Sequence, residues 1–367
     1  MAAKVYFIDL RANMKENLLD KLEKLWRTAG FDDLIKEKDL VAFKVHFGEK
    51  GNLAYIRPQF VRRLVDRVKG LGGNPFLTDA NTLYVGSRSN AVDHTVTAIE
   101  NGWNYSVVGA PIVIADGLTG KDYINVPING KHFKEVKIGS AAIHADAFIA
   151  VSHFKGHEVT GFGATIKNIG MGLGSRSGKQ MMHSDVLPSL NNEKCIGCSR
   201  CAKWCPRGAI EIIERKANII RAKCIGCGEC TVSCPEGAIA VSWKTEPHAI
   251  QEKMAEYTLG VIKDKREKCG FITFITQVSP ECDCCAWNDT PIVRDIGIIA
   301  SLDPVALDQA ACDLVNKEPA LPGSKLDGKG NDVDKLKALH PNADYEKSLA
   351  HGEIIGLGTR KYQLVKL

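Results

Sequence analysis

AFIAVSHF, residues 147–154, is a nearly continuous apolar run that leads directly into polar residues. Such runs are typical of strands that are buried on both faces of a parallel sheet. Similar runs occupy 5–10 (VYFIDL), 40–48 (LVAFKVHFG), 75–80 (PFLTDA), 106–117 (SVVGAPIVIADG), 270–278 (GFITFITQV) and 295–301. Stretches that favour helices separate them, among them 18–25, 60–68, 247–264 and 304–316. This alternation predicts an α/β fold with a largely parallel sheet flanked by helices.

The composition is that of an ordinary globular protein. The chain has 367 residues, of which 44% are hydrophobic and 25% charged, and its formal net charge is +5. This length predicts two or three domains, and this charge balance does not indicate a nucleic-acid partner. The N-terminal region lacks a signal-like apolar core, and no long apolar stretch predicts membrane insertion. We therefore expect a cytoplasmic protein.

Two cysteine-rich runs indicate iron-sulfur chemistry. CIGCSRCAKWCPRGAI (195–210) and CIGCGECTVSCPEGAI (224–239) match at ten of sixteen positions and lie 29 residues apart. Each has the spacing CxxCxxCxxxCP of bacterial ferredoxins with two [4Fe-4S] clusters, in which the fourth cysteine binds the other cluster. The first predicted ligand set is Cys195, Cys198, Cys201 and Cys234, and the second is Cys224, Cys227, Cys230 and Cys205. Two zinc sites are the alternative, but zinc rarely uses this spacing.

The cysteine-rich module interrupts the α/β pattern. The polar, turn-rich segments LPSLNNEK and WKTEPH flank it, which predicts an insert over 187–245. The α/β domain would then consist of 1–186 and 246–367. Beyond about residue 319 the sequence is loop-like, and we expect the tail to form a peripheral cap.

Polar residues follow three of the predicted strands. They are Lys44, His46 and Glu49; Asp79, Asn81 and Thr82; and His153, Lys155, His157 and Glu158. Because ligands of open parallel sheets bind at the carboxyl ends of the strands, these residues predict a pocket at one sheet edge. Candidates for binding or proton transfer are Lys44, His46, Lys155 and His157. The alternative is a set of separate surface or hydrogen-bonded core residues.

A glycine-rich segment follows the last of these strands. GFGATIKNIGMGLGSRSGK (161–179) has the composition of a loop whose backbone amides hold an anion, such as the phosphate of a flavin nucleotide. Its candidate cofactor-binding residues are Gly161, Gly163, Lys167, Gly172, Gly174, Arg176 and Lys179. The glycine spacing excludes an ATP-binding P-loop. A packing turn rich in glycine is the alternative.

Two smaller groups could also carry chemistry. The sequence SPECDCC places Cys282, Cys284 and Cys285 within four residues. These thiols could bind a further metal, form a redox-active pair, or pack as small apolar side chains. His183 and Asp185 could supply a proton or a metal ligand, or form an exposed turn.

Several motifs together resemble a known family. They are KVHFGE (44–49), TDANTLYVGSR (78–88), SHFKGH (152–157), TIKNIGMGLGSRSGK (165–179), SPECDCC and DIGIIASLDPVALDQAACDLV (295–315), together with the two cysteine runs. The chain resembles the iron-sulfur proteins named domain of unknown function 362, many of which carry a dicluster ferredoxin insert. The resemblance covers nearly the whole chain and implies a redox role in an anaerobic or microaerobic prokaryote. It implies no substrate and no catalytic residue.

The leading functional hypothesis is an iron-sulfur oxidoreductase. Its two [4Fe-4S] clusters would relay single electrons to a second redox centre in the α/β domain, either a flavin nucleotide or a metal. The partner would be a redox protein or a small-molecule electron acceptor. The alternatives are a ferredoxin-like electron carrier with a docking domain and no substrate, or a redox sensor in which the clusters mainly hold structure.

Overall fold

The computed structural model describes residues 2–84, 86–183, 188–224, 228–240, 247–330 and 332–367. Asp185, Cys227 and the predicted limits of the insert, at 186–187 and 245–246, lie outside the described residues. Among the described helices, none combines the length and the hydrophobicity needed to cross a bilayer.

An eight-stranded sheet forms the centre of the protein, in the order β16-β1-β15-β14-β7-β2-β3-β4. Its strands are β1 (Ala3–Ile8), β2 (Leu40–Lys44), β3 (Asn74–Asp79), β4 (Ile112–Ile114), β7 (Ala147–His153), β14 (Cys269–Ile275), β15 (Gly297–Ser301) and β16 (Tyr362–Lys366). The block from β14 to β4 is parallel, whereas β15 runs antiparallel to both of its neighbours. The predicted α/β fold with a largely parallel sheet is therefore confirmed.

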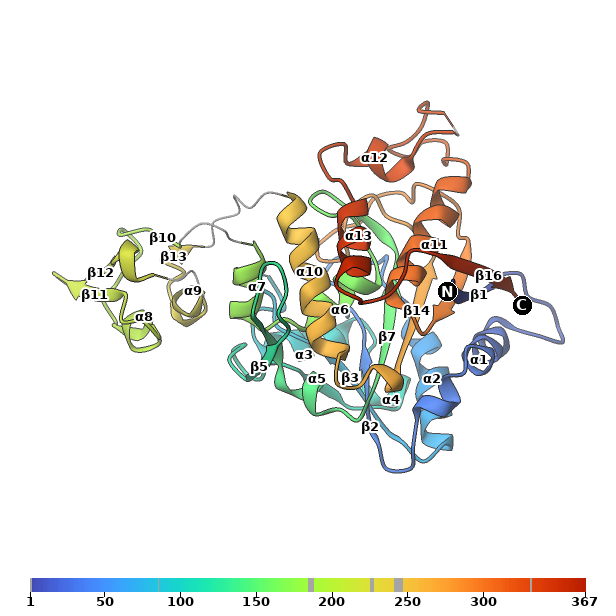
Figure 1. Cartoon of the computed structure of the whole chain (residues 1–367), viewed down its shortest axis with the longest axis horizontal. Helices are drawn as coiled ribbons and strands as arrows, with labels where there is room; N and C mark the ends of the chain where they lie inside the picture. The colour runs from blue at the N-terminus through green and yellow to red at the C-terminus, as the bar shows by residue number, and fades with distance from the viewer. Residues whose placement is uncertain (1, 85, 184–187, 225–227, 241–246, 331) are drawn as a thin grey trace.

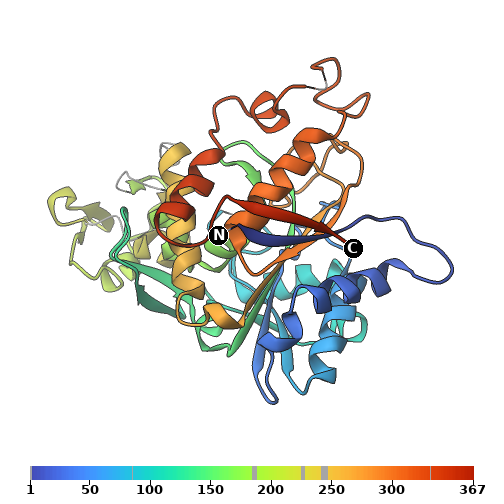
Figure 2. The same cartoon turned by 45° about the vertical axis from the view of Figure 1, so that its right-hand side comes forward.

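Helices cover both faces of this sheet (Figures 1 and 2). They are α1 (Leu18–Thr28), α2 (Pro58–Gly70), α3 (Ala91–Glu100), α4 (Tyr105–Val108), α5 (Ser140–His144), α6 (Thr165–Leu173), α7 (Arg176–His183), α10 (Pro247–Ile262), α11 (Pro304–Lys317), α12 (Lys335–Leu339) and α13 (Glu346–Ile354). Alternate residues of β7 enter different cores. Phe148 packs in the core under α6, α10 and α11, and Ile149 packs in the core under α1 and α2. Every residue of β7 is buried, which explains its unbroken apolar sequence.

Short elements complete the main body. They are the 3-10 helices η1 (Phe31–Leu34) and η3 (Arg266–Lys268), and the paired strands β5 (Tyr123–Pro127) with β6 (Glu135–Gly139) and β8 (Lys155–His157) with β9 (Gly161–Gly163). The β8–β9 pair directly follows β7 and carries polar residues beyond the end of that strand.

Two local predictions are wrong. The run 106–117 is not one strand, because Asn104 caps the short helix α4 and Gly109, with φ +76°, ends it before β4 begins. The tail is not merely a peripheral cap, because β16 pairs in parallel with β1 and forms the edge of the main sheet. Its pairing partner lies at the opposite end of the sequence, so local patterning could not identify it.

The cysteine-rich region forms its own small elements and projects from the main body (Figure 1). They are β10 (Ser189–Leu190), α8 (Arg200–Lys203), β11 (Ile210–Ile213), β12 (Lys216–Ile219), η2 (Arg221–Lys223), α9 (Glu229–Ser233) and β13 (Ile239–Ala240). Strand β10 pairs with β13, and β11 pairs with β12. A separate core gathers Cys201, Ile210, Ala217, Cys230 and Ile239.

A buried carboxylate anchors the beginning of α6. Asp308 of α11 accepts hydrogen bonds from the backbone amides of Thr165 and Ile166, each at 2.9 Å. These are two of the amides that lack partners within the helix. Burial raises the pKa of Asp308 from 3.8 to about 6. Above pH 6 the ionised carboxylate therefore carries a desolvation cost that the unfolded chain does not bear.

We expect Asp308 to make stability fall as pH rises from about 4 to about 6. In that interval the folded protein retains a proton that the unfolded protein has lost. Relative to Asp308→Asn, the free energy of unfolding of the wild type should decline by about 3 kcal/mol over this range. Urea denaturation at several pH values measures this difference. The control Asp264→Asn changes an exposed carboxylate, and its free energy of unfolding should depend on pH as that of the wild type does. The same pH dependence in Asp308→Asn would contradict the role of Asp308.

Candidate functional site

The polar residues at the strand ends surround a cavity of about 420 Å³. Its lining includes the predicted site residues His46, Asp79, Thr82, Lys155, His157 and Glu158. The cavity lies beyond the carboxyl ends of β2, β3 and β7, where the parallel block of the sheet directs these segments. Helices α6, α7 and α10 contribute a further part of the wall, together with Tyr84, Arg88 and Cys284.

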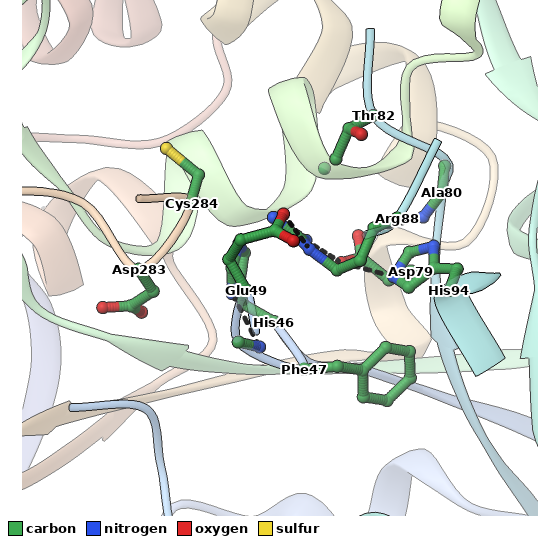
Figure 3. Close-up of polar contacts among 12 residues, drawn as sticks. His46, Phe47, Glu49, Asp79, Ala80, Thr82, Arg88, His94, Asp283 and Cys284 are labelled. Atoms are coloured by element: carbon green, nitrogen blue, oxygen red, sulfur yellow. Dashed lines mark hydrogen bonds and ion pairs between the residues drawn. The ribbon is translucent and has the colours of Figure 1, made fainter. Parts of the chain in front are cut away.

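A chain of buried charges runs beside this cavity (Figure 3). The Arg88 guanidinium donates from Nε to Glu49 at 3.1 Å, and its Nη1 lies 3.5 Å from Asp79 Oδ2. Glu49 also accepts hydrogen bonds from the amide and the hydroxyl of Ser87. Burial alone would raise the pKa of Asp79, but the charge of Lys44 holds it well below its ordinary value. The Asp79 carboxylate is therefore ionised, and both Lys44 and Arg88 pair with it.

Lys44 is a positioning residue rather than a group open to substrate. It is fully buried, does not line the cavity, and donates to Val45 O at 3.0 Å and Asn168 Oδ1 at 2.7 Å. Its third partner is Asp79 Oδ1, at 3.0 Å. Burial lowers the pKa of Lys44 to about 8. A Cβ at Gly172 would lie 2.5 Å from Lys44 Cε, so the close approach of α6 requires glycine there.

We expect Lys44→Met to destabilise the protein by about 3–5 kcal/mol, because it leaves Asp79 buried without its nearest cation. Chemical denaturation of the purified protein measures this loss, and Lys347→Met, on the exposed surface of α13, is the control. A Lys44→Met protein with unchanged stability would contradict the positioning role.

The other candidates for proton transfer differ in charge. His46 Nδ1 accepts a hydrogen bond from the Gly48 amide at 3.1 Å, which leaves the proton of the neutral ring on Nε2. Burial and the nearby Arg88 lower the pKa of His46 well below 6.5, so the ring stays neutral. Lys155 contacts Asp283 Oδ2 at 3.0 Å and donates to the carbonyl of His153 at 3.0 Å. His46 and Lys155 therefore offer N–H donors at the cavity wall.

His153, in contrast, has a structural environment. Its Nδ1 lies 2.9 Å from Asp283 Oδ1, and its Nε2 lies 2.7 Å from the Thr276 carbonyl. Both ring nitrogens are thus occupied, and the side chain is buried. The pair fixes Asp283 between Cys282 and Cys284 of the SPECDCC segment.

A potential metal-binding group adjoins the cavity. One ligand atom each from His157, Cys282 and Cys284 lies within 4.8 Å of the others. Lys167 Nζ donates to Cys282 Sγ at 3.0 Å. His157 Nδ1 accepts hydrogen bonds from the amides of Val159 and Thr160, both at 3.1 Å, which places the proton of the neutral ring on Nε2. Together with the many cysteines of the chain, this group indicates metal binding.

Burial and the neighbouring side chains shift the pKa values of this group. Burial alone would lower the pKa of Lys167, but the neighbouring sulfurs of Cys282 and Cys284 raise it above its ordinary value. The adjacent Cys284 and burial raise the pKa of the Cys282 thiol. A soft metal ion would replace the thiol protons that these surroundings retain. Cys285, the third predicted thiol, lies outside the group of three.

The glycine-rich segment is mostly helical, so the predicted anion-binding loop is wrong as a description of its backbone. Gly161 and Gly163 lie in β9, whereas the rest forms α6 and α7 and the turn between them, which contains Gly174. Asp308 already occupies the first amides of α6. A Cβ at Gly170 would lie 2.2 Å from the Met254 carbonyl of α10, which shows that tight helix packing requires glycine. Lys167, Gly172 and Lys179 line the cavity, and Gly161, Gly163, Gly174 and Arg176 do not.

The predicted cluster cysteines separate into two groups around two small cavities. Cys195, Cys198, Cys201 and Cys234 line one of them. Cys205, Cys224 and Cys230 line the other, and Cys227 lies outside the described residues. Backbone amides donate to sulfur at equivalent places in the two repeats, from Ala209 to Cys205 at 3.1 Å and from Ala238 to Cys234 at 3.3 Å. The described cysteines form no disulfide.

Helix α7 contacts both parts of the protein. On the side of the cysteine-rich region, Thr231 of α9 donates to Gln180 at 3.5 Å, and a Cβ at Gly228 would lie 2.3 Å from Gln180 Cγ. On the other side, Lys179 and His183 line the large cavity. Lys137 strengthens the contact through an ion pair with Glu229 at 2.8 Å. Asp185, the predicted companion of His183, lies outside the described residues.

Several cavity residues were not predicted as site residues. Arg88 and Tyr84 occur in the family-like motif TDANTLYVGSR, but nothing in their spacing signals that they contact Glu49 or the Cys284 carbonyl. Ile250 and Met254 enter the wall from α10, which follows the cysteine-rich region in the sequence. Their positions depend on tertiary packing that a single sequence does not reveal.

Comparisons with known proteins identify a family for this chain but no activity. A search of curated protein sequences finds no significant match. The lactate racemase apoprotein from Thermoanaerobacterium thermosaccharolyticum is 11% identical, with a TM-score of 0.40 over 86% of this chain and 58% of that one. A structural-genomics protein from Thermotoga maritima is 12% identical, with a TM-score of 0.41 over 82% of this chain and 59% of that one. The chain thus matches less than two thirds of either structure.

The family comparison covers most of the α/β framework and the cavity. The model of the family described as domain of unknown function (DUF362) matches residues 41–313. This range contains β2, the polar strand ends, both cysteine repeats and the SPECDCC segment. The chain therefore belongs to the DUF362 family.

Proposed function

We propose that this protein is an iron-sulfur oxidoreductase with a metal centre at His157, Cys282 and Cys284. The observation that carries the proposal is the convergence of these three ligands, two of which, His157 and Cys284, line a cavity of about 420 Å³. A ferredoxin-like carrier needs no such pocket. We further propose that the two cysteine sets of the insert hold [4Fe-4S] clusters, with residues 187–245 as the inserted module.

The insert provides suitable surroundings for such clusters. Its described cysteines line two separate cavities in the combination that exchange of the fourth ligand requires, with Cys234 in the first group and Cys205 in the second. When bound, [4Fe-4S] clusters exchange single electrons, at potentials that hydrogen bonds to sulfur help to set. The amides of Ala209, Ala217 and Ala238 donate such bonds to cysteine sulfurs.

The second centre is better explained by a metal than by a flavin nucleotide. Thiolate and imidazole ligands suit iron, copper and zinc. A flavin phosphate would need free backbone amides, but Asp308 occupies those at the start of α6. The Lys167 ammonium offsets thiolate charge at Cys282. A metal at His157 would displace the Nε2 proton to solvent, because Nδ1 already accepts two amide hydrogen bonds.

The surrounding side chains would bind and orient a substrate. His46 and Lys155 present hydrogen-bond donors, and Ile250 and Met254 exclude water from part of the cavity. Asp79 and Glu49 hold Arg88 in place rather than titrating with the reaction. The polypeptide thus supplies position and electrostatics, while bound cofactors supply electron chemistry.

Metal analysis of anaerobically purified protein tests the second centre. We expect about eight irons per chain from the insert and one further metal ion. The double variant Cys282→Ser/Cys284→Ser should lose that ion and retain about eight irons. Cys269→Ser, which changes a buried thiol of β14 outside both sites, is the matched control. About eight irons with no further metal in the wild type would instead favour the electron carrier, and stoichiometric flavin would favour the flavin alternative.

A separate prediction concerns the insert itself. Cys224→Ala and Cys198→Ala should each lower iron from about eight to about four per chain, because each removes a ligand of one cluster. The metal at Cys282 should remain in both variants. Iron, zinc and acid-labile sulfide determinations, with electron paramagnetic resonance of the reduced protein, measure the outcome. Zinc without sulfide in the wild type would contradict the cluster assignment.

A further inference from the structure

Several buried cations line the large cavity. Arg88, Lys155 and Lys179 line it and are only 1%, 4% and 6% exposed, and Lys167 adds a fourth, partly buried cation. Asp79 and Glu158 are the carboxylates of the described lining. Arg88 is paired with Glu49 and Asp79, Lys155 is paired with Asp283, and Glu158 is exposed. An anionic ligand would therefore find its partner at a cation that these carboxylates do not pair.

Lys179 is a buried cation of the lining whose hydrogen-bond partners are backbone carbonyls. Its ammonium donates to the carbonyls of Gly174 at 2.6 Å and Gly172 at 3.3 Å. Within the part of the chain that the structure describes, no carboxylate lies within 4.0 Å of it. An ammonium has three N–H donors, so these two carbonyls leave one for a ligand. Burying a cation with neutral partners alone is costly, and an anion in the cavity would offset that cost.

Part of the wall is apolar and favours a ligand with a hydrocarbon body over an inorganic ion. Leu83, Val159, Met171, Ile250 and Met254 contribute apolar surface to the same cavity. Its volume of about 420 Å³ falls in the range of small-molecule sites. Acetate or inorganic phosphate would leave this apolar surface in contact with water. A molecule with a hydrocarbon body would cover it.

We propose that the cavity binds an organic anion, a carboxylate or phosphate monoester with a hydrocarbon body, whose charged group contacts Lys179. The proposed function makes this molecule the substrate, because His157 and Cys284 belong to the same lining. Binding itself does not depend on that role. The inference consequently remains testable in a protein that proves to have no further metal.

Isothermal titration calorimetry of the anaerobically purified full chain tests the inference. The probes are phenylacetate, phenyl phosphate, the neutral 2-phenylethanol, and acetate and inorganic phosphate, which lack the hydrocarbon body. We expect phenylacetate or phenyl phosphate to bind about tenfold more tightly than the other three, as one charge-assisted hydrogen bond and apolar burial imply. The tighter of the two identifies the anionic group. Equal affinity for 2-phenylethanol, or no binding of either aromatic anion, would overturn the inference.

Variants locate the site. Lys179→Met should weaken binding of the preferred probe about tenfold, whereas Lys179→Arg should retain most of the affinity. Lys347→Met, which removes an exposed charge outside the cavity, should change nothing. Because Lys179→Met could also disturb α7, Met171→Trp provides a second test: it fills the apolar part of the cavity and should weaken the aromatic anions. Unchanged binding in both folded variants would refute the site.

Metal content measured on the same samples separates the two proposals. Loss of the further metal with anion binding intact would leave the ligand assignment standing and remove the redox role. A protein that holds the further metal but binds no anion would leave the redox role standing and overturn the ligand assignment.

Discussion

The buried ion chain from Lys44 through Asp79 and Arg88 to Glu49 is the interaction on which the site depends. Charges removed from water must find partners, and here each partner comes from a different segment. Lys44 joins β2 to α6 through Asn168, and Arg88 joins the segment after β3 to Glu49. Glu49 in turn donates its backbone amide to the Asp283 carbonyl at 3.1 Å. The same network therefore positions the SPECDCC segment and its thiols.

This arrangement divides the polar residues into those that hold the framework and those that face the cavity. Lys44 and His153 are saturated with partners and hold the strand ends in register with their surroundings. His46 stays neutral because burial and Arg88 lower its pKa. Lys179 donates to two backbone carbonyls, which leaves its third N–H for a ligand. Neighbouring residues of the same type thus have different chemistry because their burial and partners differ.

The sequence predicts structure well where the pattern of a short stretch alone indicates which of its residues are buried. The run 147–154 predicted a strand buried on both sides, which is what two separate helix layers require of β7. The polar residues after β2, β3 and β7 pointed to the correct edge because parallel strands deliver their ends together. Composition misled at 161–179, where glycines permit close helix packing rather than an open loop. The pairing of β16 with β1 and the approach of α10 to the cavity depend on distant segments, which local patterns do not encode.

The contact between α7 and the cysteine-rich region distinguishes the two halves of the cysteine repeat. Ser199 and Gly228 are equivalent positions in the two halves, and both adopt left-handed backbone conformations, with φ +63° and +75°. The first half carries a side chain there, but in the second half a Cβ would meet Gln180 at 2.3 Å. The two halves are therefore not interchangeable at this position. A cysteine-rich region transplanted into this framework would fit only if its second half carried glycine there, so the packing against α7 fixes which half of the repeat faces the main body.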